Sequence, residues 1–559
     1  MRTMKRQTIL AGAGIMMVAT ILSRLLGFVR EGAMGYFWDT KSLHTNAFWA
    51  AFNVPDLLYY LLSGGALSAS IIPVLTAYLH REERDESWRI ASTLFTVFAL
   101  CAAVGVAIIM VFARPLVLLV APGFGPKQAA ECAGYVRIIA PMVLFTVTSA
   151  LTTGILQSHR HFTAPAMAWL VYNFGIIGGA FIGGMVINQR PDDPAGLRGP
   201  AYGVIAGAIL LVVVQIPALV GRGFRPRLSL ELSHPGVREA LRLFLPYMVG
   251  LAATQICLLW LPGFFGSYFA GGVASLRYAN RLVILPYGLF GISIATAAFP
   301  AMAERVAAGE IAEFRKLVSG SFRAILFLVI PCAAGLFVLA GPILRLLWKR
   351  GEFDETSVAM SAFALTAFAG SLVALSGLQI LNRAFFSLKD RRTPPLVAVG
   401  YNVVIVIAAV ALMRTPLQYG APAAAVSIGA FAGLFLLMEL LRRRIGGIDG
   451  RQIMLSIGRM LIAAAALGMA AFAVCQWTGR ALHVPVMHFS LVAPSAHAAI
   501  PNIATPKAAV GMQVLASMAA GIAAYLLVLV LLRAPEISSV RALLRQRRAA
   551  KPAQTADVS

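Results

Sequence analysis

Acidic residues are scarce in this chain of 559 residues. It has 23 Asp and Glu against 47 Lys and Arg, only 13% of its residues are charged, and 59% are hydrophobic. Soluble domains carry about 25% charged and about 45–50% apolar residues, so the composition excludes a soluble globular protein. In so apolar a chain, the net charge of +24 indicates cytoplasmic loops that face anionic membrane lipids. We expect no nucleic-acid partner.

Cysteine is also rare, and no two of the five cysteines are close in sequence. This spacing excludes a disulfide framework and a CxxC metal site, and we expect no metal and no cofactor. The chain lacks the DxD, Walker and GxSxG motifs, and its acid pairs Glu82–Glu83 and Asp192–Asp193 fall in short loops. We therefore expect that the protein is not an enzyme and has no catalytic residues.

Long apolar windows separated by polar breaks are the dominant pattern. Crossing a bilayer takes about 20 mostly apolar residues in a helix, and the alternating segments of a membrane barrel are missing. The sequence predicts an all-α polytopic membrane protein with fourteen transmembrane helices, near residues 8–36, 47–78, 90–113, 132–156, 163–187, 200–220, 243–267, 275–303, 317–341, 357–382, 393–413, 420–440, 452–476 and 511–532.

Basic residues are unevenly distributed among the predicted loops. With an even number of spans both termini lie on one side, and the segments on that side hold 29 of the 47 Lys and Arg, against 11 on the other side. The positive-inside rule then places both termini in the cytoplasm.

The chain contains an internal repeat. Pro73 recurs as Pro300, Pro115-Leu116 as Pro342-Ile343, Thr163-Ala164-Pro165 as Thr393-Pro394-Pro395 and Tyr172-Asn173 as Tyr401-Asn402, at offsets of 227 to 230 residues. The repeat predicts two six-helix lobes of the same orientation, an N-lobe over 1–221 and a C-lobe over 243–443, joined by a cytoplasmic linker over 222–242. Two extra helices over 444–533 and a basic cytoplasmic tail over 534–559 follow. Parallel repeats are a transporter architecture, so we expect a substrate path between the lobes and alternating access.

Four arginines lie deep within predicted spans: Arg24, Arg30, Arg277 and Arg281. Each costs about 2.5–3.5 kcal/mol at the centre of a membrane helix, so these side chains should face an interior. Arg277 and Arg281 are four residues apart and share a helix face. Only Glu31 and Asp56 are acidic in the same spans, which leaves two surplus positive charges. The surplus predicts a dianionic ligand such as a diphosphate, which Arg binds through its planar fork; an internal network of ion pairs is the alternative.

Three neutral residues complete the predicted binding site. Arg30 lies about 120° from Arg24 on a straight helix, so the two reach one cavity only if the helix bends, and Gly27 between them would act as the hinge. Asn46 and Asn280 could hydrogen-bond the ligand, or simply join neighbouring helices.

Several stretches resemble the MurJ/MviN family of bacterial lipid II flippases. Ser23–Glu31 (SRLLGFVRE) resembles the first-helix signature of that family, Asn46–Leu58 (NAFWAAFNVPDLL) its second-helix motif, and Tyr278–Leu282 (YANRL) its eighth-helix motif. The match covers the first twelve predicted spans in order, and fourteen spans is the number found in the family.

The resemblance implies a member of the multidrug/oligosaccharidyl-lipid/polysaccharide exporter superfamily, located in the bacterial inner (cytoplasmic) membrane. Such a protein flips lipid II, the undecaprenyl-diphosphate-linked peptidoglycan precursor, from the inner to the outer leaflet. The resemblance also implies that Arg24, Arg30 and Arg281 are cavity arginines, that Ser23 belongs to the headgroup site, and that the last two helices form a groove for the lipid tail. We expect a monomer.

The chain departs from the family at several positions. Many members carry a basic residue in the second span where this chain has Tyr59 and Tyr60, and often an acid where it has Asn280. We predict that Arg277, one turn from Arg281, replaces the missing arginine. Two alternatives remain: a related exporter of another polyprenyl-linked oligosaccharide or of drugs, and a transferase acting on polyprenyl carriers, for which the catalytic motifs are missing.

Overall fold

The computed structural model describes residues 2–63, 66–159, 161–187, 195–224, 227–256, 260–484, 492–495, 500 and 505–536. Within these ranges the chain is helical, and the one pairing of extended backbone is an isolated bridge between Arg350 and Phe353. Most of the predicted basic tail, residues 537–559, falls outside the described residues.

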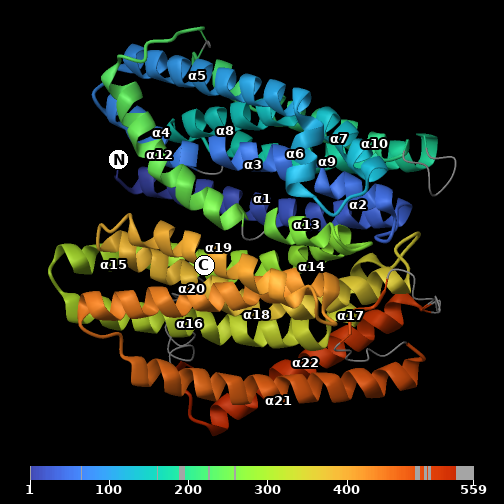
Figure 1. Cartoon of the computed structure of the whole chain (residues 1–559). Helices are drawn as coiled ribbons and strands as arrows, with labels where there is room; N and C mark the ends of the chain where they lie inside the picture. The colour runs from blue at the N-terminus through green and yellow to red at the C-terminus, as the bar shows by residue number, and fades with distance from the viewer. Residues whose placement is uncertain are drawn as a thin grey trace, which may run out of the picture.

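The helices form two layers (Figure 1). One layer holds α1 (Arg2–Phe37), α2 (Leu43–Ala50), α3 (Asn53–Leu62), α4 (Ala66–His80), α5 (Arg84–Val111), α6 (Ala113–Val120), α7 (Pro126–Ile139), α8 (Met142–Ser158), α9 (Thr163–Ile182), α10 (Arg198–Val213), α11 (Ile216–Val220) and α12 (Pro235–Gln255). The other holds α15 (Ser293–Ala307), α16 (Ile311–Val338), α17 (Ala340–Trp348), α18 (Glu355–Ser387), α19 (Thr393–Leu412), α20 (Ala421–Ile445), α21 (Gly450–Leu482) and α22 (Lys507–Leu531), and α13 (Leu261–Gly266) and α14 (Gly272–Pro286) lie between the layers.

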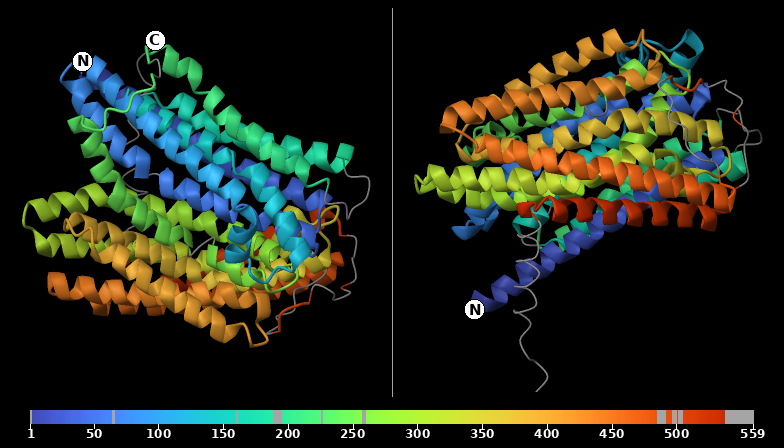
Figure 2. Two further views of the ribbon diagram at one scale, coloured as in Figure 1. Left: turned by 45° about the horizontal axis from the view of Figure 1, so that its top comes forward. Right: turned by 90° about the horizontal axis from the view of Figure 1, so that it is seen from below.

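Eleven helical stretches in the described part are long and apolar enough to cross a membrane. They match all the predicted spans except three. The predicted span 8–36 is covered by the continuous helix α1, whose N-terminal end projects from the bundle in the right-hand view of Figure 2. The span 47–78 is divided among α2, α3 and α4, and the span 243–267 between α12 and α13. Pro55 and Pro262 lie in the first turns of α3 and α13, where no backbone donor is needed, so each proline starts a new helix.

Buried hydrophobic side chains gather in two large clusters. One runs from Ala33 to Ala274 and the other from Leu261 to Ala534, so the chain has one core in each layer. Residues 235–242 of the expected linker are helical and begin α12, and Val237 and Ala240 pack into the first core.

The two halves are bonded to each other at the end of the bundle that the charge pattern places outside. Lys41 Nζ lies 2.6 Å from Asp354 Oδ2, and the Glu352 amide donates to the Tyr36 carbonyl at 3.1 Å. Gly351 has a φ of +59°, and a Cβ there would overlap the Tyr36 carbonyl, so only glycine allows this close approach. We call these five residues the outer seam.

Candidate functional site

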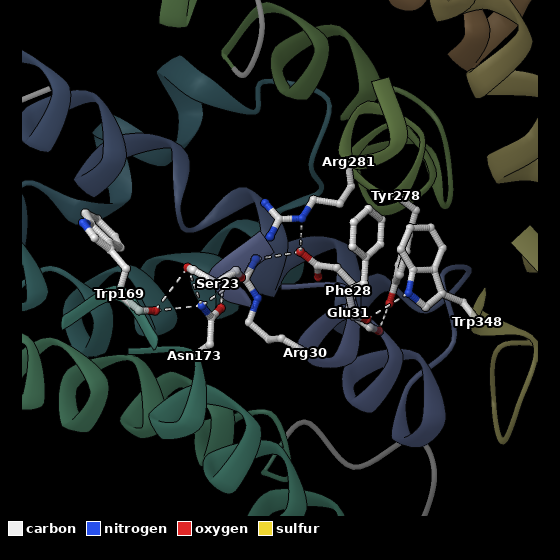
Figure 3. Close-up of polar contacts among 9 residues, drawn as sticks. All are labelled: Ser23, Phe28, Arg30, Glu31, Trp169, Asn173, Tyr278, Arg281 and Trp348. Carbon is white, nitrogen blue, oxygen red and sulfur yellow. Dashed lines mark hydrogen bonds and ion pairs between the residues drawn. The ribbon is translucent and has the colours of Figure 1, made fainter. Parts of the chain in front are cut away.

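Glu31 is the centre of the intramembrane charge cluster. It lies near the C-terminal end of α1 and is only 2% exposed. Its Oε1 accepts a hydrogen bond from Arg30 Nη2 at 2.7 Å and lies 3.9 Å from Nε of Arg281, which comes from α14 (Figure 3). The predicted first and eighth spans are thus joined by one carboxylate between two guanidinium groups.

A second set of bonds ties this face of α1 to α9. Arg30 Nη1 lies 3.5 Å from Asn173 Oδ1, while Asn173 Nδ2 lies 3.4 Å from Ser23 Oγ and 2.9 Å from the Trp169 carbonyl. Ser23 Oγ also donates to the Trp169 carbonyl at 3.4 Å. Asn173 therefore orients Arg30, a role the sequence analysis missed although it had noted Tyr172-Asn173 as part of the repeat.

Gly27, whose role as a hinge stays a prediction, lies where a side chain from another helix approaches α1. α1 runs through Gly27 without interruption, and the guanidinium of Arg281 lies directly against it, where a Cβ would overlap Nη2. The Arg281 guanidinium also lies 6.0 Å from the centre of the Phe28 ring. The missing side chain at Gly27 therefore makes room for a cation from α14.

Arg24 contacts the C-terminal end of α14. Its Nη1 donates to the Leu285 carbonyl at 3.4 Å, and its guanidinium packs against Gly288. These residues flank Pro286, after which the chain adopts a π-helical segment, Tyr287–Ile292, before α15 begins. Prolines and π-helical turns interrupt the regular backbone hydrogen bonds of an α-helix, and here the Leu285 carbonyl accepts a hydrogen bond from Arg24.

Arg277 reaches the second predicted span. Its guanidinium carbon lies 4.3 Å from the centre of the Trp49 ring and 5.0 Å from that of Phe52, on α2 and just before α3. Such cation–π contacts hold a guanidinium without neutralising it. Asp56 on α3 is close enough to interact electrostatically with Arg277 and Arg30. Its carboxylate forms no hydrogen bond or ion pair of 4 Å or less with another described residue.

The two asparagines differ in what they contact. The Asn46 side chain donates to the carbonyls of Thr40 and Ser42 at 2.8 Å, and it accepts from the Ala274 amide in the first turn of α14 at 3.0 Å. In this structure Asn46 therefore caps a helix of the other half. Asn280 lies buried on α14 between the two arginines of that helix.

Backbone bonds from the second half complete the site. Tyr278 Oη donates to the Glu31 carbonyl and Trp348 Nε1 to the Phe28 carbonyl, both at 3.1 Å (Figure 3). Neither residue was predicted, because nothing in the sequence marks a side chain that binds a backbone carbonyl over 200 residues away.

The structure brings the four predicted arginines and the two acids within electrostatic reach of one another. Arg281 remains 28% exposed, so its guanidinium is available to a ligand. Within the described residues no three His, Cys, Asp or Glu side chains are grouped to hold a metal ion. The four described cysteines, Cys101, Cys132, Cys332 and Cys475, are free thiols.

Comparison with known families gives a consistent result. The family model described as lipid II flippase MurJ matches residues 40–492, a range that begins beyond the arginines of α1. The chain is 30% identical over 449 residues to the probable lipid II flippase MurJ of Bdellovibrio bacteriovorus, covering 79% of this chain and 84% of that protein. It is also 30% identical over 477 residues to the probable lipid II flippase MurJ of Rhizobium meliloti, covering 82% and 85%.

Solved structures share the fold. A structure described as lipid II flippase MurJ in an inward closed conformation superposes with a TM-score of 0.70 at 20% identity, covering 93% of this chain and 98% of that one. An inward-facing multidrug resistance transporter of the MATE family gives 0.60 at 14% identity, covering 77% and 98%.

Proposed function

This chain belongs to the lipid II flippase MurJ family, and we propose that its charge cluster binds the diphosphate of lipid II during transport. The protein flips lipid II, the undecaprenyl-diphosphate-linked peptidoglycan precursor, from the inner to the outer leaflet of the bacterial inner membrane. It works as a transporter, and its binding groups are Arg24, Arg30 and Arg281.

The observation that carries this assignment is the sharing of Glu31. One buried carboxylate contacts both Arg30 and Arg281, so it can neutralise only one of them. A dianionic diphosphate would balance the surplus charge, and guanidinium groups bind phosphate oxygens through paired hydrogen bonds. Glu31 then serves to hold the two arginines together while the site is empty.

Arg277 supplies the charge that many family members place in the second span. It extends from α14 to Trp49 and Phe52, so its charge lies beside the second span although its backbone belongs to the eighth. The neighbouring Asp56 offsets part of that charge when no ligand is bound.

Transport proceeds by alternating access between two lobes of six spans each, within a chain of fourteen. The outer seam supports a state closed toward the outside, so lipid II enters from the cytoplasmic side. The prenyl tail stays in lipid and follows a groove beside α21 and α22, which lie at the outer edge of the second layer (Figure 1). The basic tail contacts anionic lipids, both termini are cytoplasmic, and the protein acts as a monomer.

Binding and complementation test this function. The gene should restore growth to a bacterium depleted of its own lipid II flippase, and Arg281→Ala should fail to do so at equal membrane abundance. Arg383→Ala is the matched control, since Arg383 is half-buried on α18, outside the cluster and away from the helices of the tail groove. Purified protein that binds a drug or another polyprenyl-linked oligosaccharide but not lipid II would support the alternative exporter function instead.

A further inference from the structure

We infer that a row of aromatic side chains beside the arginines binds the sugar part of the lipid II headgroup. This inference rests on the proposed function, because it assigns a second part of the same substrate. The row consists of Tyr59 and Tyr60 on α3 and Trp169 and Tyr172 on α9, and we call it the aromatic wall.

The aromatic wall is continuous across two helices that are distant in sequence. Ring centres are 5.1 Å apart for Tyr60 and Tyr59, 6.4 Å for Tyr59 and Trp169, and 5.8 Å for Trp169 and Tyr172, with the rings edge to face in each pair. Such contacts fix the orientation of the rings, and each contact covers part of only one ring face. A rigid aromatic surface is thus present before any ligand binds.

The aromatic wall is left partly uncovered. Trp169 is 44% exposed and the three tyrosines are half-buried, whereas Trp49 and Tyr278, on the other side of the cluster, are both about 2% exposed. The rings of the wall therefore have free surface that the packed aromatics lack.

The wall adjoins the charge cluster and not the lipid. Asp56 lies on α3 one turn before Tyr60 and interacts electrostatically with both Tyr60 and Tyr172, and Arg30 likewise interacts with Tyr172. A carboxylate facing hydrocarbon would be costly, so Asp56 and the rings around it face the protein interior. The Trp169 carbonyl, which binds Ser23, fixes the same face of α9 against α1.

The chemistry of this surface suits a saccharide. The C–H faces of a hexose ring are apolar and stack on aromatic rings, while its hydroxyl and amide hydrogens need acceptors. Asp56 is an acceptor with no hydrogen bond from another described side chain, and it interacts electrostatically with Arg277 as well as with Tyr60 and Tyr172. The sugar of lipid II is bonded directly to the diphosphate, so a diphosphate held by Arg30 and Arg281 places the sugar beside the wall.

The test separates the sugar from the diphosphate. Purified full-length protein would be titrated with lipid II and with undecaprenyl diphosphate, which lacks the sugars and the peptide. We expect Tyr60→Leu and Trp169→Leu each to weaken lipid II binding by up to about tenfold and to leave undecaprenyl diphosphate binding unchanged. Tyr202→Leu, which removes an exposed Tyr on α10, is the control and should change neither.

Further variants decide between stacking and other causes. Tyr60→Phe keeps the ring and should bind lipid II nearly as the parent does; a loss as large as that of Tyr60→Leu would overturn the inference. Equal weakening of both ligands by the leucine variants, or no change with either, would also overturn it. Arg281→Ala should weaken both ligands, and an unchanged affinity for undecaprenyl diphosphate there would count against the proposed function, whatever the wall variants show.

Discussion

Two buried glutamates, each contacted by two cations, show how similar ion clusters come to do different things. Glu31 on α1 contacts Arg30 and Arg281, while Glu355 at the start of α18 contacts Arg345 and Lys349 of the preceding segment. Both carboxylates are nearly inaccessible, at 2% and 4% exposure.

The clusters differ in where their cations come from and how well these are covered. Arg345 and Lys349 lie within ten residues of Glu355 and are almost fully buried. Arg281 comes from another helix, is 28% exposed, and lies near further arginines that Glu31 does not contact. A buried cation covered by its own acid is costly to separate from that acid, whereas a surplus of accessible cations is suited to an anionic ligand.

Removing the acid of the structural cluster should have the largest effect. Glu355→Ala removes the carboxylate that contacts two buried cations, and we expect the free energy of unfolding to fall by about 3–5 kcal/mol. Thermal unfolding of the purified protein measures this loss, while the fraction that remains folded should bind lipid II normally. A variant of normal stability and poor binding would reverse the assignment of the two clusters.

Removing a cation from the other cluster should give the opposite result. Arg281→Ala leaves Glu31 paired with Arg30, so we expect little loss of stability. Lipid II binding should weaken by about 10- to 100-fold, because a charged hydrogen bond is worth about 1.5–3 kcal/mol. Calorimetric titration measures the affinity, and an Arg281→Ala protein that unfolds far more easily than the parent would contradict the comparison.

A substitution that changes no charge tests whether the position of Arg281 beside Glu31 matters for binding. Gly27→Ala puts a methyl group where the Arg281 guanidinium lies, so the flexible arginine must move away from Glu31. We expect lipid II affinity to fall by about three- to tenfold, equivalent to about 0.7–1.4 kcal/mol. Gly320→Ala in α16, whose added Cβ meets no atom within 4 Å, is the control. Equal affinities for the two variants would show that the position of Arg281 is unimportant.

The smallest effect is expected at the outer seam, where a half-buried ion pair joins the two halves. Asp354→Asn keeps the N-cap of α18, in which the Asp354 side chain accepts from the Ser357 amide at 2.8 Å, but it removes the ion pair with Lys41. Because ion pairs that keep contact with solvent are worth about 0.2–1 kcal/mol, the outward-open population should rise by at most about fivefold. Labelling of an engineered cysteine near the outer seam reports that population, and a shift of 100-fold would be inconsistent with a solvent-accessible pair.

The pKa of Asp354 sets the pH range of this effect. Burial acts to raise the pKa, but the hydrogen bonds from Lys41 and the Ser357 amide outweigh it and hold the pKa below its ordinary value of 3.8. A carboxyl with a lowered pKa contributes its stabilisation above its pKa in the unfolded chain and loses it as the pH falls through the lowered value. The outer seam should therefore be insensitive to pH through the neutral range and weaken only in strong acid.

Hydropathy predicted the helical fold well because each apolar window is local. The division of span 47–78 into three helices was missed, although Pro55 marked one of the breaks.

Intramembrane charge identified the arginines, since a cation in an apolar span is unusual wherever it lies. The partners of those arginines could not be predicted, because Arg277 meets Trp49 across 228 residues of sequence and no local pattern encodes that contact. Gly27 shows a further limit, since nothing in the local sequence indicates that Arg281 of α14 lies against it.

The attachment of α1 on two flanks has a consequence for transport. Ser23 and Arg30 bond to Asn173 on α9, whereas Tyr278 and Trp348 bond to carbonyl oxygens on the opposite side of the same helix. Any motion that parts α9 from α14 and α17 must break one set of bonds and keep the other. The difference in free energy between the two sets of bonds decides whether α1 moves with α9 or with α14 and α17. It therefore also decides from which side of the binding site lipid II separates.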